Sequence, residues 1–126
     1  MSEQDFDPGY FNLERDGDIA VATFLATQLT EEDNVEQIGH ELTALVDKLQ
    51  HRRVVLNLAT VKYATSAVIG KWIMLKRKLD REGGKLVVCG LQPGLADILS
   101  TSQLLTYFDV TDNTAQARDL CANATG

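Results

Sequence analysis

The stretch from Val54 to Gly70 reads Val-Val-Leu-Asn-Leu-Ala-Thr-Val-Lys-Tyr-Ala-Thr-Ser-Ala-Val-Ile-Gly and decides the fold of this chain. An apolar strand is followed by a short polar loop, and the hydroxyl residues Thr65 and Ser66 then stand where an amphipathic helix is expected to begin. Such hydroxyls often cap helices by accepting a hydrogen bond from a free backbone N–H. A hydroxyl at a helix start is also well placed for reversible phosphorylation. Ser66 is therefore interpreted as a helix cap, as a phosphate acceptor, or as both.

The elements that flank this stretch predict a βαβ unit. Residues 53–58 are almost continuously apolar, as expected for a parallel strand covered on both faces. The helix over 66–82 carries an apolar stripe at three- and four-residue spacing, formed by Val68, Trp72, Leu75 and Leu79. Trp72 lies in the middle of this stripe, so we expect it in the core. Gly83-Gly84 ends the helix, and residues 85–90 form the next buried strand.

The rest of the chain completes one α/β domain. Strands are predicted over 10–15 and 19–25, on either side of a turn signal, and over 107–111. Helices are predicted from a capping box at Thr30–Asp33 to about Gln50, over 93–103 and over 113–124. The sequence thus predicts a mixed sheet of about five strands with about four α-helices. Residues 1–9 are expected to form a flexible tail, and residues 10–124 the single domain.

The length, charge and cysteine content of the chain argue against several classes of protein. The chain has 126 residues, which favours one domain, and no apolar run long enough to span a membrane. Two cysteines and an acidic N-terminus without a secretory leader favour a cytoplasmic location. The net charge of −6 argues against direct nucleic-acid binding. No metal-ligand cluster or phosphate-binding glycine loop is visible, so no metal or cofactor is expected.

The positive charge is concentrated in one segment. Six basic residues lie between positions 71 and 85: Lys71, Lys76, Arg77, Lys78, Arg81 and Lys85. The simpler interpretation is a solvated helix face. The alternative is a surface that attracts an acidic partner.

Over residues 10–120 the chain resembles the STAS domain, the fold of bacterial anti-sigma factor antagonists. In that family a strand and a hydrophobic loop precede Asp-Ser-Ser/Thr-Gly, Leu-Gly and a helix, and the first Ser accepts a phosphate. The similar segments here are Leu58 to Tyr63, Gly70, Gly83-Gly84 with the strand after it, 92–104 and 108–110.

The family motif maps onto this chain with substitutions. The family Asp falls on Thr65, the phosphate acceptor on Ser66, the next hydroxyl on Ala67 and the first Gly on Val68. An acidic position of the family at the first helix falls on Thr30. The resemblance implies phosphorylation of Ser66, with Thr65 the less favoured acceptor. It also implies a partner-binding surface made of Ala64, Thr65, Ser66, Ala67, Val68 and Ile69.

The function implied by the resemblance is partner switching. The unphosphorylated domain would bind an anti-sigma factor serine kinase and free the sigma factor, and a serine phosphatase would restore it. The alternative is a constitutive scaffold or adaptor in a signalling assembly or transporter complex, because Thr65 and Thr30 replace acidic residues.

An enzyme is not expected. A Ser or Thr nucleophile needs a base within hydrogen-bond reach. The only histidines, His40 and His51, lie on or just past the first predicted helix and are expected at the surface. No Gly-x-Ser-x-Gly elbow surrounds Ser66. Cys89 is expected to be buried. Cys121, in the last predicted helix, is a candidate for reactivity, although no neighbour in the sequence clearly lowers its pKa.

Overall fold

The computed structural model describes residues 8–30 and 35–122 of this protein. Its central sheet has five strands in the order β1 (Phe11–Asp16), β2 (Ile19–Phe24), β4 (Arg53–Asn57), β6 (Lys85–Cys89) and β7 (Asp109–Thr111). The helices of the described residues are α1 (Val35–Asp47), α2 (Ser66–Arg81), α3 (Pro93–Thr101) and α4 (Thr114–Ala122). The predicted fold class, a mixed sheet of about five strands with about four helices, is confirmed.

The sheet is mixed because only its first pair is antiparallel. β1 and β2 form a hairpin, in which Asp16 pairs with Ile19 next to the turn. The other three pairs of neighbouring strands, β2 with β4, β4 with β6 and β6 with β7, are parallel. Their carboxyl ends therefore meet at one edge of the sheet, and the loops that leave this edge are brought together.

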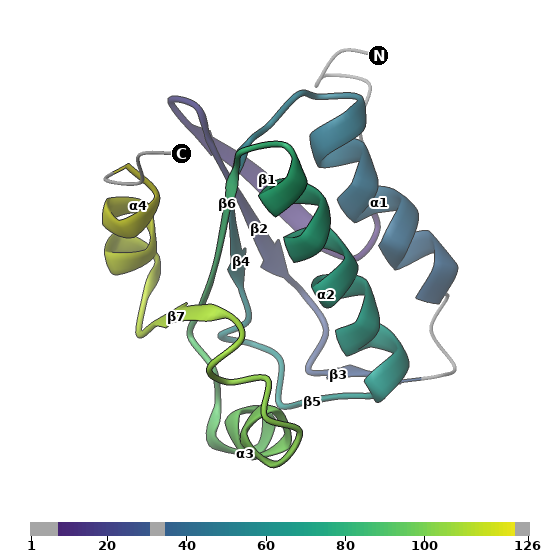
Figure 1. Cartoon of the computed structure of the whole chain (residues 1–126). Coiled ribbons are helices and arrows are strands. Elements are labelled where there is room, and N and C mark those ends of the chain that lie inside the picture. Colours follow the sequence, from purple (N-terminus) through teal and green to yellow (C-terminus); the bar gives the residue numbers. More distant parts are fainter. Residues whose placement is uncertain (1–7, 31–34, 123–126) are drawn as a thin grey trace.

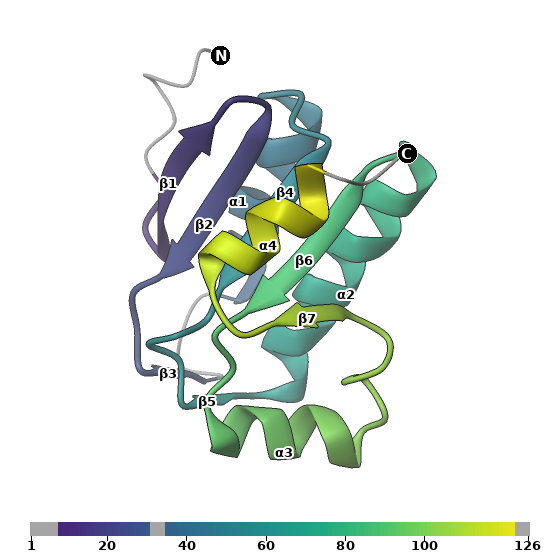
Figure 2. The same cartoon turned by 90° about the vertical axis from the view of Figure 1, so that its left-hand side faces the viewer.

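Helices cover both faces of the sheet. Figures 1 and 2 show α1 and α2 side by side on one face, α4 on the opposite face and α3 below the sheet. Side chains alternate across each strand, so Val54 and Leu56 face α1 and α2, whereas Val55 faces α4. Two buried clusters result, and the larger one lies under α1 and α2.

The larger core confirms the stripe predicted for α2. Trp72 is 1% exposed, and its ring meets Phe24 edge-on at a centroid distance of 5.9 Å. Phe24 in turn packs on Phe11 of the edge strand at 5.4 Å. This row of aromatic side chains ties α2 to the hairpin across the sheet.

The N-terminal segment is fixed to α1 by a buried carboxylate. Glu41 is 5% exposed, and its carboxylate accepts hydrogen bonds from the backbone N–H groups of Gly9 and Tyr10 and from the side-chain amide of Gln37. These bonds compensate the cost of burying a charge. Residues 1–7 of the predicted tail lie outside the described residues, so the predicted boundary between tail and domain stays a prediction.

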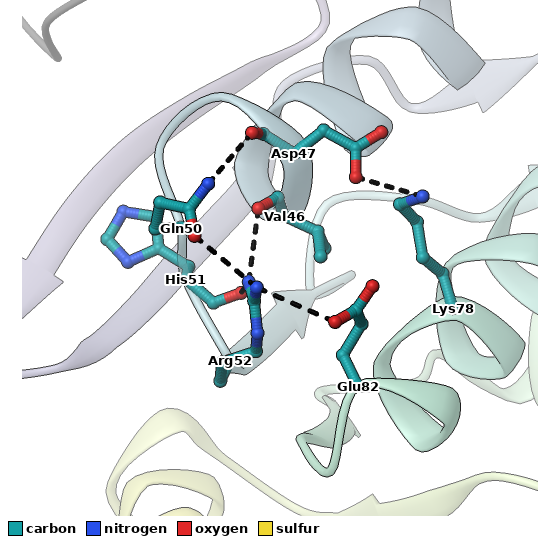
Figure 3. Close-up of polar contacts among 7 residues, drawn as sticks. All are labelled: Val46, Asp47, Gln50, His51, Arg52, Lys78 and Glu82. Atoms are coloured by element: carbon teal, nitrogen blue, oxygen red, sulfur yellow. Dashed lines mark hydrogen bonds and ion pairs between the residues drawn. The ribbon is translucent and has the colours of Figure 1, made fainter.

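Helix α1 ends earlier than the sequence predicts, and only this end of the helix can be compared with the prediction. The predicted capping box includes residues 31–34, which lie outside the described residues. At the other end the helix stops at Asp47, short of the predicted Gln50, because Gln50 adopts a left-handed φ of 62°. The side chains of Gln50 and Arg52 then bond the carbonyls of Asp47 and Val46, as Figure 3 shows.

His51 was predicted to lie at the surface, and this prediction is wrong. The left-handed residue before it turns the chain back toward the sheet, and the His51 N–H donates to the Leu45 carbonyl. The side chain is consequently buried, with 6% of the residue exposed. His40 is exposed, as predicted.

Gly84→Ala should destabilise the fold strongly. A Cβ atom at Gly84 would lie 2.2 Å from the Arg52 carbonyl oxygen, a backbone atom that cannot rotate away. The Lys85 N–H donates to that same carbonyl, so a shift would disturb the start of the β4–β6 pairing. We expect a loss of about 2–3 kcal/mol in the free energy of unfolding, measured by urea denaturation. Gly83→Asn is the control, because Gly83 has φ 75° and an open surrounding. An unchanged stability in Gly84→Ala would contradict this account.

Candidate functional site

The segment before α2 is held by a small second sheet that the sequence did not predict. β3 (Gln28–Leu29) and β5 (Tyr63–Ala64) pair in parallel at the carboxyl edge of the main sheet. The backbone N–H of Lys62 donates to the Thr27 carbonyl at 2.7 Å, and the N–H of Thr65 donates to the Leu29 carbonyl at 3.0 Å. The start of α2 is thereby fixed to the loop that follows β2 (Figure 1).

The two neighbouring hydroxyls have different environments. Thr65 is the N-cap residue of α2, with extended backbone, but its side chain makes no capping hydrogen bond. Its Oγ1 atom is buried and has no hydrogen-bond partner among the described residues. Ser66 is the first helical residue and is exposed. Ser66 is thus not the helix cap, and a reagent or protein in solvent reaches Ser66 before Thr65.

The first turn of α2 has an uncompensated positive end. No acidic residue lies in that turn, and Thr65 supplies no side-chain acceptor within the described structure. The free N–H groups of a helix start carry a partial positive charge and bind anions. A phosphate on Ser66 would therefore enter a favourable field without disturbing an existing cap.

Three of the six residues of the predicted partner-binding surface are buried in the domain, and partner binding at this surface stays a prediction. Ala64, Val68 and Ile69 are 1%, 0% and 3% exposed and belong to the core. Val68 shares the helical periodicity that buries Trp72, and Ala64 faces inward in β5. The surface around Ser66 is formed instead by Ala67, which is exposed, and by Thr65, which is half-buried.

Tyr63, three residues before Ser66 in the chain, is an exposed aromatic residue that the sequence did not indicate as part of the site. Its side chain is 45% exposed and lies in β5, beside the inward-facing Ala64. The alternation that turns Tyr63 outward spans only a two-residue strand. A pattern this short has no signal in the sequence, because period-two alternation needs several residues to be recognised.

Most of the predicted basic segment is neutralised. Lys71 pairs with Glu36 at 3.3 Å, Lys76 with Asp80 at 2.9 Å, Lys78 with Asp47 at 2.9 Å and Lys85 with Asp109 at 2.7 Å. Figure 3 shows the pair of Lys78 and Asp47, which links α1 to α2. Among the described residues, Arg77 and Arg81 have no acidic partner. The positive charge of this segment is therefore carried by two arginines rather than six side chains.

No group of three or more His, Cys, Asp and Glu side chains in the described part of the chain is arranged to hold a metal ion. No described helix is long and apolar enough to cross a membrane.

Cys89 of β6 and Cys121 of α4 are both buried in the smaller core cluster between α4 and the sheet, which confirms the prediction for Cys89. Burial raises the pKa of each thiol to about 11, since removal from water disfavours the thiolate. The thiolate is the reactive form of cysteine. The surroundings of Cys121 therefore disfavour its reactive thiolate form, and Cys121 is not an activated thiol.

Both thiols should resist alkylation until the protein unfolds. We expect iodoacetamide at about pH 8 to label neither cysteine of the folded protein, and to label both in denaturant, as measured by intact mass. Folded thiols keep their protons up to about pH 11, whereas unfolded ones lose them from the ordinary value of 9.0. The unfolded state then binds fewer protons, so stability should fall between pH 9 and 11. The Cys89→Ala/Cys121→Ala variant should lack this part of the decline. Rapid labelling of the native protein would contradict the burial.

Comparison with known proteins supports one family. The STAS domain model matches residues 11–117. A candidate anti-sigma factor antagonist of Bordetella bronchiseptica, BtrV, is 36% identical over 80 residues, which are 64% of this chain and 68% of that protein.

Solved structures share the fold at lower identity. The STAS domain protein of Planctomyces limnophilus superposes with a TM-score of 0.79 at 20% identity, covering 90% of this chain and 98% of that one. The Bacillus cell fate determinant SpoIIAA in its phosphorylated form gives 0.67 at 17% identity, covering 87% and 98%. Taken with the family match over most of the chain and the sequence relative, this chain belongs to the STAS domain family, among the anti-sigma factor antagonists.

Proposed function

We propose that this domain is a partner switch controlled by phosphorylation of Ser66. In the unphosphorylated form it binds an anti-sigma factor serine kinase in the cytoplasm, and the bound kinase then no longer holds its sigma factor. Transfer of the ATP γ-phosphate to the Ser66 hydroxyl releases the domain, and a serine phosphatase hydrolyses the phosphate to restore it.

The observation that carries this proposal is the contrast between the two hydroxyls. Ser66 is exposed at the first position of a 16-residue helix, whereas the Thr65 oxygen beside it is buried. A phosphate on Ser66 would meet the positive end of the α2 dipole, so the modified domain keeps its fold. SpoIIAA, which has this fold, exists in a phosphorylated form.

The switch works through charge on a small neutral surface. Ala67 and the half-buried Thr65 flank Ser66, and Tyr63 adds an exposed ring from β5. A phosphate adds about −1.5 to −2 charges to this surface. A docked partner would have to bury that charge without a cation, which is costly. Release therefore needs no refolding of the domain.

The test is to map the phosphate after incubation with ATP and each purified anti-sigma factor kinase of the source organism. Trypsin cleaves after Lys62 and Lys71, so one peptide holds Thr65 and Ser66, and its fragment ions must separate them. We expect phosphate on Ser66 in wild type and in Thr65→Ala, and none in Ser66→Ala. Binding of a kinase without modification of Ser66 would instead favour the scaffold or adaptor.

A further inference from the structure

The solvent-facing side of α2 contains a row of four exposed residues that the packing of the domain does not explain. At 100° per residue, Ser66, Gly70, Arg77 and Arg81 fall within about 60° of arc. We call them the α2 stripe. All four are exposed, and the row rises about 22 Å along the helix axis.

Gly70 is the first unexplained member. Glycine is unfavourable inside a helix, and it is usually present because a neighbour approaches too closely for a side chain. Gly39 of α1 is such a case, since a Cβ there would lie 3.0 Å from the Lys71 side chain. At Gly70, however, a Cβ would meet nothing within 4 Å among the described residues. The helix thus contains an exposed glycine that nothing in the described domain requires.

Arg77 and Arg81 are the second unexplained feature. They are four residues apart on one helix face, an arrangement in which like charges repel. The neighbouring lysines of α2 are paired with carboxylates, whereas these two arginines have no acidic partner within the described residues. The helix dipole favours Arg81, which lies in the last turn, but it does not account for Arg77.

We propose that the α2 stripe is the docking surface for an acidic face of the partner protein, here the anti-sigma factor kinase. This inference rests on the proposed function and adds the chemistry of the partner. Carboxylates of the partner pair with Arg77 and Arg81, and main-chain or other bulky atoms of the partner approach Gly70 where a side chain would interfere. Charge complementarity supports an acidic occupant, since these two cations have no acidic partner in the described part of a chain whose net charge is −6.

The two halves of the stripe have separate tasks. Arg77 lies about 16 Å along the axis from Ser66, which exceeds the Debye length of about 8 Å at physiological salt. Arg77 therefore does not neutralise a phosphate on Ser66. The arginines accelerate and orient association, as peripheral charges generally do. Ser66 and Gly70 lie at the N-terminal end of the α2 stripe, where the partner makes close contact. A phosphate on Ser66 therefore acts at this end to release the partner.

The experiment measures association rates of purified anti-sigma factor kinases of the source organism with immobilised wild type and variants, at about 50 mM and about 500 mM NaCl. Arg77→Glu is expected to lower the association rate constant about tenfold at low salt, and less at high salt. Lys48→Glu is the matched control, because Lys48 is exposed, outside the stripe and without an acidic partner among the described residues. It should leave the rate nearly unchanged.

Gly70→Ala gives an independent signature. It should raise the thermal midpoint of the free domain by about 4 °C, because alanine favours the helix and meets no neighbour. The same variant should weaken kinase binding about tenfold, since the added methyl group overpacks the interface. A variant that unfolds cannot show both effects.

The outcomes separate this inference from the proposed switch. Equal rates for Arg77→Glu and Lys48→Glu, with release by Ser66 phosphorylation intact, would overturn the stripe alone. Weaker binding of Arg77→Glu with no effect of Ser66 phosphorylation would overturn the switch alone. If no kinase binds wild type, or if Arg77→Glu changes only self-association in sedimentation, the proposed occupant is wrong.

Discussion

The domain phosphorylated on Ser66 is expected to bind its anti-sigma factor kinase about a thousandfold more weakly than the unmodified domain. The phosphate adds about −1.5 to −2 charges at an exposed position flanked by neutral residues. A single like-charge pair 4 Å apart costs about 4 kcal/mol at an effective dielectric constant near 20. A penalty of this size corresponds to about three orders of magnitude in the dissociation constant.

The measurement is isothermal titration calorimetry with enzymatically phosphorylated protein, and Ser66→Asp serves as a mimic with less charge and a smaller effect. Ser100→Asp is the matched control, because Ser100 is also exposed but lies in α3. Ser66→Ala should bind like wild type, since removing a hydroxyl adds no charge. The thermal midpoint of the phosphorylated domain should not fall, because the helix start favours the anion. Equal affinities of the phosphorylated and unphosphorylated domains for the kinase would contradict the switch and favour the constitutive scaffold or adaptor.

Trp72→Ala should remove about 3–5 kcal/mol from the free energy of unfolding. Trp72 is 1% exposed and is one of the largest fully buried side chains of the described core. Its loss leaves a cavity between α2 and the sheet and removes the edge-on contact with Phe24. Small domains have a total stability of about 5–15 kcal/mol, so this variant loses a large part of it.

Trp72→Phe is the informative control for the cavity. The indole Nε1 is buried and has no hydrogen-bond partner among the described residues, which itself is unfavourable. Phenylalanine keeps a ring beside Phe24 and removes this unpaired donor, so we expect a loss below about 2 kcal/mol. Unfolding must be followed by circular dichroism, because Trp72 is the only tryptophan. Equal stability of the two variants would contradict the packing described for the core.

Elements set by neighbours in the chain were predictable from the sequence. Gly83-Gly84 ended α2 within one residue of the predicted position, and the stripe that contains Trp72 faces the core as periodicity required. The exposed start of α2 at Ser66 was predicted in the same way. These features depend on backbone and side-chain preferences within one or two turns, and the local sequence contains that information.

Features set by distant segments were not predictable. The pairing of β3 with β5 joins residues 28 and 63, and the short strands carry no pattern of their own. The buried position of His51 follows from the turn at Gln50 and from packing. The polar sequence around it, with Gln50 before it and two arginines after it, favours solvent. The neutralisation of the basic segment required Glu36, Asp47 and Asp109, which lie on α1 and β7.

The sequence by itself determined the α/β class, the order of the main elements and the helix start that presents Ser66. Only the tertiary structure decided which hydroxyl is accessible, because folding buries the Thr65 oxygen and leaves Ser66 exposed. It also decided that Ala64 and Ile69 are core rather than surface and that Arg77 and Arg81 remain unpaired within the described residues. The physical reason is that local conformational preference acts over a few residues, whereas burial and charge pairing depend on residues that only folding brings together.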